Sequence, residues 1–102
     1  MTKKRIASLD EIAVGELCRV EVDGVAVCLA RVAENELYAI GDVCTHEEQS
    51  LSEGELDGYS VECPLHGSAF DLRSGSVSMP PAYDPAPTFP VTLDGSAVFI
   101  EI

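Results

Sequence analysis

The sequence predicts a small all-β domain built from antiparallel hairpins. Apolar residues come in short runs of four to nine that are rich in Val, Ile and Leu, and helical periodicity is nearly absent. Turn signals such as Asp-Gly separate these runs. The 102 residues, of which 46% are apolar, suffice for one hydrophobic core and predict one domain.

The first expected element is a helical turn over residues 8–12, with Ser8 or Asp10 as its cap. Five hairpins follow, each marked by a turn between two apolar runs. They are 17–22 with 25–32 around Asp23-Gly24, 25–32 with 37–40 around Glu34-Asn35, 55–56 with 59–61 around Asp57-Gly58, 70–72 with 77–79 around Ser74-Gly75, and 91–93 with 97–102 around Asp94-Gly95. The segment 80–90 holds five of the six prolines and cannot be regular throughout.

Acidic residues outnumber basic ones by 18 to 6, which gives a formal net charge of −12 at pH 7. The stretch between Val32 and Leu72 contains no Lys or Arg and carries ten acids. Such a surface either keeps the protein soluble or forms a negative docking face for basic partners. Because the same charge repels phosphates, we expect no binding to nucleic acid.

No apolar run reaches the roughly 18–20 residues of a transmembrane helix. Lys3, Lys4 and Arg5 open the chain without the apolar segment of a secretory signal behind them. We therefore expect a cytoplasmic protein that does not enter a membrane. In a reducing cytosol, its four cysteines predict metal ligation in preference to disulfides.

The four cysteines divide into two pairs. Cys18 and Cys28 lie in apolar segments with no His nearby, which is typical of small core residues. Cys44 and Cys63 lie beside the two histidines of the chain, in Cys44-Thr45-His46 and, sixteen residues later, Cys63-Pro64-Leu65-His66. Two thiols and two imidazoles suit either a structural zinc site or an iron–sulfur cluster in which two His replace two Cys. Zinc-finger modules usually draw ligands from a helix, which this sequence lacks.

The ligand spacing and the continuation Gly67-Ser68-Ala69-Phe70-Asp71, then Arg73-Ser74-Gly75, resemble the Rieske family of 2Fe–2S proteins. The likeness runs from about Ala39 to Met79. It implies an antiparallel β sandwich or barrel base, with a small cluster-binding subdomain of two loops over about residues 41–79. Residues 1–102 would then form a single Rieske domain.

The same resemblance implies that Cys44 and Cys63 hold the inner iron of one 2Fe–2S cluster, while His46 and His66 hold the outer iron. The expected cluster environment consists of Thr45, Pro64, Leu65, Gly67, Ser68 and Phe70. Respiratory Rieske proteins carry an extra disulfide, whose cysteines would fall at Gln49 and Leu65, and a Tyr where this chain has Phe70. Ser68 matches a hydroxyl donor of the respiratory proteins and is retained. Because the disulfide and the Tyr are missing, the chain is more similar to the soluble, lower-potential Rieske ferredoxins.

Such ferredoxins carry one electron from a flavin reductase to the terminal oxygenase of an aromatic-ring dioxygenase, so the resemblance implies a monomeric electron carrier with no reaction of its own. Once both histidines are ligands, none remains for an oxygenase's mononuclear iron. The alternatives are the small Rieske-like subunit of an assimilatory nitrite reductase and, from the ligand set alone, a zinc-binding module. We expect transient electrostatic docking through Glu47, Glu48, Glu53 and Glu55. Apolar contacts through Leu65, Pro80 and Pro81 are the other possibility.

Overall fold

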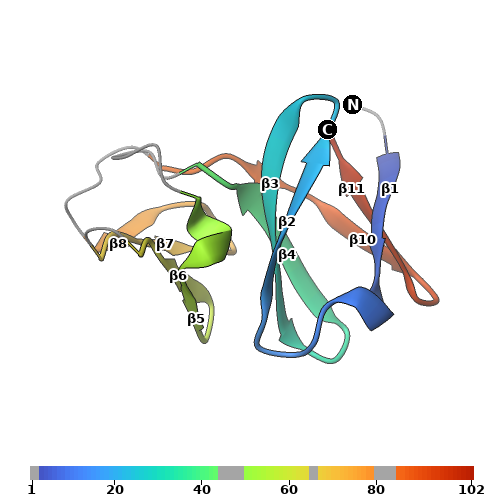
Figure 1. Ribbon diagram of the computed structural model, residues 1–102, viewed down its shortest axis with the longest axis horizontal. Coiled ribbons are helices and arrows are strands. Elements are labelled where there is room, and N and C mark those ends of the chain that lie inside the picture. The colour runs from blue at the N-terminus through green and yellow to red at the C-terminus, as the bar shows by residue number, and fades with distance from the viewer. Residues whose placement is uncertain (1–2, 44–49, 65–66, 80–84) are drawn as a thin grey trace.

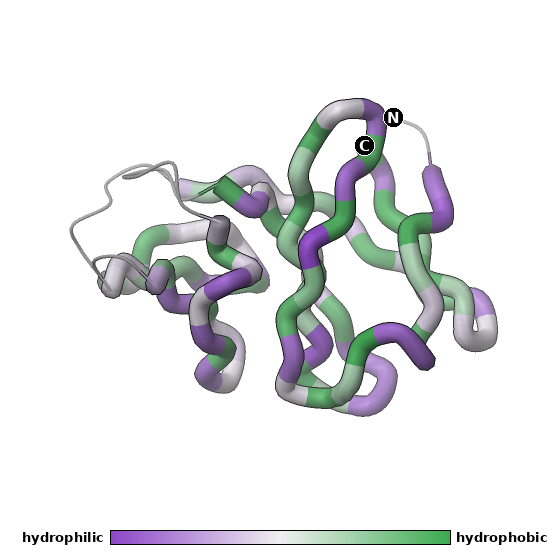
Figure 2. The backbone as a smooth tube through the Cα atoms, in the orientation of Figure 1, coloured by the Kyte–Doolittle hydropathy of each residue, from purple (hydrophilic) through white to green (hydrophobic). Residues whose placement is uncertain are grey.

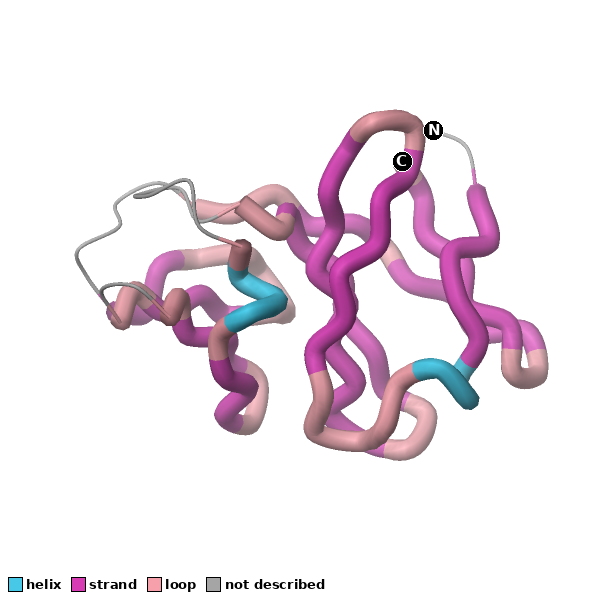
Figure 3. Tube along the Cα trace, in the orientation of Figure 1, coloured by secondary structure: helices cyan, strands magenta, loops and turns pink. Residues whose placement is uncertain are grey.

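The computed structural model describes residues 3–43, 50–64, 67–79 and 85–102, whose strands form three antiparallel sheets (Figure 1, Figure 3). The outer sheet has the order β1 (Lys3–Ser8), β11 (Ala97–Glu101) and β10 (Val91–Asp94). The central sheet has the order β2 (Leu17–Val22), β3 (Val25–Ala33), β4 (Glu36–Gly41) and β9 (Thr88–Phe89). The small sheet has the order β5 (Glu55–Asp57), β6 (Ser60–Glu62), β7 (Ala69–Asp71) and β8 (Val77–Met79). This architecture confirms the predicted all-β fold class.

The central sheet is buried on both faces. Side chains alternate along β3, so that Val27 and Leu29 face the outer sheet, whereas Cys28 and Ala30 face the small sheet. All four are fully buried, which explains why β3 reads as a continuous apolar run. Apolar colouring continues along most of β3 (Figure 2).

Each face of the central sheet contributes to its own apolar core. The outer core joins Val27 and Leu29 to Val98 and Ile100 of β11. The inner core joins Cys28, Ala30 and Ile40 to a second set of residues, most of them near the small sheet. That set consists of Leu51, Val61, Cys63, Phe70, Leu72 and Ala86. The inner core therefore attaches the middle third of the chain to the central sheet.

All five predicted hairpins are present. The turn between β2 and β3 shows why its residues were informative. Asp23 and Gly24 have φ of 51° and 81°, the left-handed conformation that a type I′ turn needs at both central positions. Turn chemistry thus fixed the register of β2 against β3.

The helical turn expected at residues 8–12 is η1 (Leu9–Glu11), a 3₁₀ turn whose first residue follows Ser8. The Ser8 N–H donates to the Glu11 carboxylate at 2.7 Å. On β3, Arg31 secures this segment by donating to the carbonyls of Leu9 and Ile12 at 3.0 and 2.8 Å. No helix among the described residues is long and apolar enough to cross a membrane.

Three elements were not predicted. Strand β1 contains the basic residues Lys3–Arg5, whose sequence is typical of a charged terminus. It is an edge strand, where charged side chains are common. Strand β9 has two residues and lies between prolines. The 3₁₀ turn η2 (Leu51–Glu53) has a single buried apolar residue, Leu51, and so carries no periodic signal.

An aromatic contact closes the seam between the central and small sheets. The rings of Tyr38 and Tyr59 meet edge to face with centroids 5.9 Å apart, and the Arg73 guanidinium lies 4.4 Å from the Tyr59 ring centroid. Both tyrosine hydroxyls donate to the Glu36 carboxylate, at 2.5 Å from Tyr38 and 3.4 Å from Tyr59. The hydrogen bond to Glu36 raises the pKa of Tyr38 to about 12.

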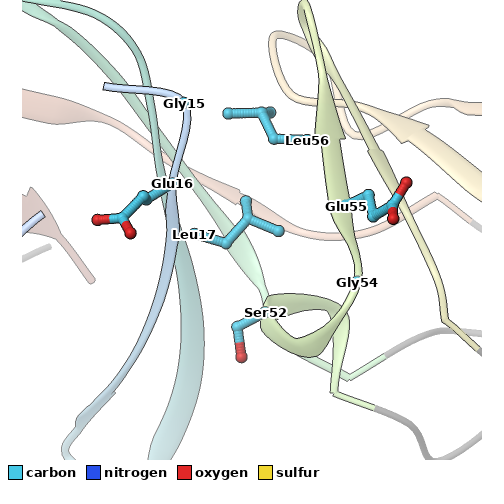
Figure 4. Close-up of a pocket in the computed structure, with 7 residues that line it drawn as sticks. All are labelled: Gly15, Glu16, Leu17, Ser52, Gly54, Glu55 and Leu56. Carbon is cyan, nitrogen blue, oxygen red and sulfur yellow. The ribbon is translucent and has the colours of Figure 1, made fainter. Parts of the chain in front are cut away.

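Elsewhere along the boundary, a groove of about 420 Å³ separates the start of β2 from η2 and β5 (Figure 4). Leu17 and Leu56 project into it from opposite walls, and both also pack against the inner core. Among the described residues the small sheet shares no strand with the central sheet, and the side chains of the inner core join the two.

Replacing Cys28 by Ser should destabilise the protein, because a hydroxyl would be buried in the inner core. We expect a loss of about 1–3 kcal/mol in the free energy of unfolding, measured in urea. The control is Cys18→Ser, since Cys18 is only half-buried and should lose clearly less. Equal losses for the two variants would contradict the placement of Cys28 in the core.

Candidate metal centre

Cys63, the predicted ligand that lies within the described residues, directly follows β6 and is 1% exposed. Its N–H donates to the carbonyl of Ser68 at 2.7 Å, and its carbonyl accepts from the N–H of Gly67 at 3.2 Å. These bonds close the second loop at its two ends. Gly67 has φ of +76°, a left-handed conformation that glycine adopts without steric cost.

The second loop is thus the connection between β6 and β7, whose last ladder pair is Glu62 with Ala69. Of its predicted environment, Ser68 and Phe70 are buried and Pro64 is exposed. Phe70 lies opposite Val61 in the ladder, and both pack in the inner core with Cys63. Cys63 is therefore buried against apolar side chains of the inner core.

The first loop departs and returns at one point of the fold. Val43 and Ser50 form an isolated antiparallel bridge, and the Leu51 N–H donates to the Asp42 carbonyl at 2.6 Å. The residues in between lie outside the described part of the chain: Cys44, Thr45, His46, Glu47, Glu48 and Gln49. The same holds for Leu65, His66, Pro80 and Pro81.

The end of the first loop packs against the start of the second. A Cβ atom added to Gly54 would lie 1.8 Å from the carbonyl oxygen of Glu62, the residue before Cys63. Leu51, three residues earlier, is fully buried in the same core as Cys63 and Phe70. The fold therefore brings the described ends of both ligand loops to the same side of the small sheet.

These observations fit a cluster held by two thiols and two imidazoles. One predicted ligand, Cys63, is buried beside apolar side chains at the base of a tightly closed loop, and the other three predicted ligands belong to segments whose described ends lie near it. Among the described residues alone, no group of three or more His, Cys, Asp or Glu gathers into a metal site, since three of the four predicted ligands lie outside them.

Cys18 and Cys28 have the properties predicted for cysteines that are not ligands. Burial is the main cause that raises the pKa of the Cys28 thiol, and the nearby Asp42 adds to it. Burial likewise raises the pKa of Cys18, with smaller effects of Glu11 and Glu16. The raised pKa values are typical of structural cysteines in apolar surroundings.

A cavity of about 260 Å³ lies directly beside Cys63 and Pro64, and three exposed glutamates line it. Glu53 and Glu55 were predicted from the sequence, but Glu62 was not singled out. Glu55 and Glu62 are opposite each other in the β5–β6 ladder, an arrangement that costs stability for like charges. Neither Glu55 nor Glu62 forms an ion pair with another described residue, so no basic side chain among them neutralises these two negative charges.

Several known proteins are similar to this chain. The model of the Rieske [2Fe-2S] domain matches residues 2–90. The ferredoxin component of the p-cumate 2,3-dioxygenase system of Pseudomonas putida is 37% identical over 98 residues, which cover 95% of this chain and 83% of that protein. The biphenyl dioxygenase ferredoxin subunit of Pseudomonas sp. (strain KKS102) is 40% identical over 102 residues, covering 99% and 93%.

Solved structures agree. The ferredoxin of carbazole 1,9a-dioxygenase from Nocardioides aromaticivorans IC177 has a TM-score of 0.92 at 32% identity, covering 98% of this chain and 97% of that one. A ferredoxin in complex with its oxygenase, also of carbazole 1,9a-dioxygenase, has a TM-score of 0.89 at 33% identity, covering 96% and 91%. A protein described as a nitrite reductase small subunit is more distant, with a TM-score of 0.84 at 25% identity over the whole of both chains.

Replacing Gly54 by Ala should force the two loop ends apart, because the new methyl group would overlap the Glu62 carbonyl oxygen. We expect a loss of stability greater than the ~1–2 kcal/mol that left-handed strain costs an alanine. The control with that strain alone is Gly58→Ala, since Gly58 has φ of +60° and open space around it. A Gly54→Ala protein as stable in urea as Gly58→Ala would contradict the close contact.

Proposed function

The chain belongs to the Rieske [2Fe-2S] domain family, and from this membership we propose that it is the ferredoxin of a dioxygenase system that attacks aromatic compounds. It transfers electrons and has no reaction of its own. The observation that carries the proposal is the identity of 37% and 40% to two such ferredoxins over nearly the whole chain. The alternative, a nitrite reductase small subunit, is less supported, because the solved structure so described is only 25% identical to this chain.

The cofactor is a Rieske 2Fe–2S cluster, which accepts and releases one electron when bound. This family membership sets the zinc module aside. We assign Cys44, His46, Cys63 and His66 as its ligands. Two neutral imidazoles in place of two thiolates reduce the negative charge of the ligand set, and this favours reduction.

The residues around Cys63 hold this part of the site in place. Phe70 and Leu51 pack with Cys63 in the inner core, and the Gly67 N–H holds the loop closed through the Cys63 carbonyl. We propose that the small sheet and the two loops, about residues 41–79, are the cluster-binding subdomain, and that the other two sheets are its base. The inner core, which joins the two, supports this division.

We further propose that partners dock on an acidic face beside the cluster, formed by Glu47, Glu48, Glu53, Glu55 and Glu62. The related carbazole ferredoxin forms a complex with its oxygenase, and a flavin reductase is the expected donor. Small, charge-steered interfaces suit a carrier that must bind and release quickly. Pro80 and Pro81 are the candidates for an apolar contact.

We place the protein in the cytoplasm. Cys18 and Cys28 are free thiols, in keeping with a reducing compartment.

Changing Cys63 to Ser should remove the cluster, because ligand binding and loop folding are coupled. The wild-type protein should be red-brown and contain two irons and two sulfides per chain, and it should support product formation by a ring dioxygenase and its reductase. Cys18→Ser is the control and should keep its iron. A colourless wild-type protein, or a Cys63→Ser variant with unchanged iron and paramagnetic resonance, would overturn the assignment.

Neutralising the acidic face should slow partner association. We expect Glu55→Gln/Glu62→Gln to lower the stopped-flow rate of electron exchange with a basic reductase or oxygenase. The difference should shrink as salt rises, because the Debye length falls to about 8 Å at 0.15 M ionic strength. The control, Asp10→Asn/Asp94→Asn, removes the same charge from η1 and from the β10–β11 hairpin (Figure 1). Equal slowing by the two double variants would refute docking at this face.

A further inference from the structure

Asp42, which follows β4 directly, is the one charged residue that is buried among those the structure describes, at 1% exposure. Burying a carboxylate is costly unless it is paired and hydrogen-bonded. This one lies two residues before Cys44, at the point where the first loop leaves the central sheet. Its partners therefore show what the burial accomplishes.

The Asp42 side chain binds the residues on which the first loop returns. One carboxylate oxygen accepts from the Ser52 N–H at 2.8 Å, and the other accepts from the Ser50 hydroxyl. The Ser50 and Ser52 hydroxyls lie 2.9 Å apart. With the Val43–Ser50 bridge, these bonds tie the departing and returning strands of the loop together.

The backbone of Asp42 anchors the same point to the central sheet. Its N–H donates to the Ala26 carbonyl at 3.0 Å, and its carbonyl accepts from Leu51 at 2.6 Å. Figure 1 shows η2 packed beside β2 and β3 at this place. The residues where the first loop departs and returns, 42–43 and 50–52, form the neck of the loop. They are thus fixed both to each other and to the central sheet.

Arg19 supplies the countercharge from a different strand. Its Nε lies 3.3 Å from the second Asp42 oxygen, and its terminal nitrogen lies 3.3 Å from the Glu21 carboxylate. Arg19 is opposite Cys28 in the β2–β3 ladder, and Cys28 is opposite Ile40. The Arg19 side chain therefore reaches across the central sheet to the neck of the loop. It is half exposed.

We propose that Arg19 and Asp42 form a positioning pair for the cluster. Asp42 holds the neck of the loop that carries Cys44 and His46, and Arg19 offsets the negative charge that this arrangement places beside the cluster. The proposal rests on the proposed function, since it takes Cys44 as a ligand. Neither residue is among the proposed ligands, so both would act through the loop and through their charges.

The test is the reduction potential of the purified, cluster-containing protein. Arg19→Gln should shift the midpoint to more negative values, because an uncompensated carboxylate near the cluster opposes the added electron. Arg19→Lys, which keeps the charge, should restore it. Arg73→Gln is the control, because Arg73 is also exposed and paired with an acid, Asp71 at 3.1 Å, but is not tied to the first loop by any contact described.

The double variant Arg19→Gln/Asp42→Asn separates coupling from a general charge effect. Its potential should lie closer to the wild-type value than that of Arg19→Gln. In Asp42→Asn, hydrogen exchange of the Leu51 and Ser52 amides should be faster than in the wild type. Should the Asp42 variant fail to fold, equal potentials for Arg19→Gln and Arg19→Lys alone would overturn the pair.

An Arg19→Gln shift that persists unchanged with Asn at position 42, or one matched by Arg73→Gln, would also overturn it. A wild-type protein without iron and sulfide would instead refute the proposed function. If the wild-type protein holds its cluster but the Arg19 variants have the same reduction potential as the wild type, the pair alone is refuted.

Discussion

The inner core between the central and small sheets is the contact on which the rest of the molecule depends. The small sheet has strands of three residues each, the lower end of the usual range of strand lengths. It persists because Val61 and Phe70 pack against Cys28 and Ile40 of the central sheet. The same core buries Cys63, so the stability of the domain and the placement of this proposed ligand have one origin.

This dependence explains the composition of β3. A strand that serves two cores must be apolar on both faces, and small side chains such as Cys28 and Ala30 allow the small sheet to approach closely. The continuous apolar run in an otherwise acidic chain is therefore a requirement of the layered arrangement. Burial in this run also raises the pKa of the Cys28 thiol.

Local chemistry made much of the fold predictable. Asp-Gly turns identified hairpins because left-handed residues leave few alternatives, and the spacing of the Cys and His residues identified the family. The Arg19–Asp42 pair and the approach of Gly54 to Glu62 escaped prediction, because both join residues distant in the chain with no local pattern. Glu62 was visible as an acid, but only the β5–β6 register places it opposite Glu55. The same limit applies to β9, which exists through its pairing with β4.

The aromatic seam has a practical consequence. The chain has three tyrosines and no tryptophan, and two of the three, Tyr38 and Tyr59, lie on opposite sides of the boundary between the two parts. Their ultraviolet absorption and fluorescence therefore report on that boundary without an introduced label. Separation of the small sheet would break the ring contact and the Tyr59–Glu36 hydrogen bond, whereas Tyr38 and Glu36 both belong to β4 and would stay together. The strands of the outer sheet contain no tyrosine, so a change in tyrosine absorption can distinguish opening of the seam from unfolding of that sheet.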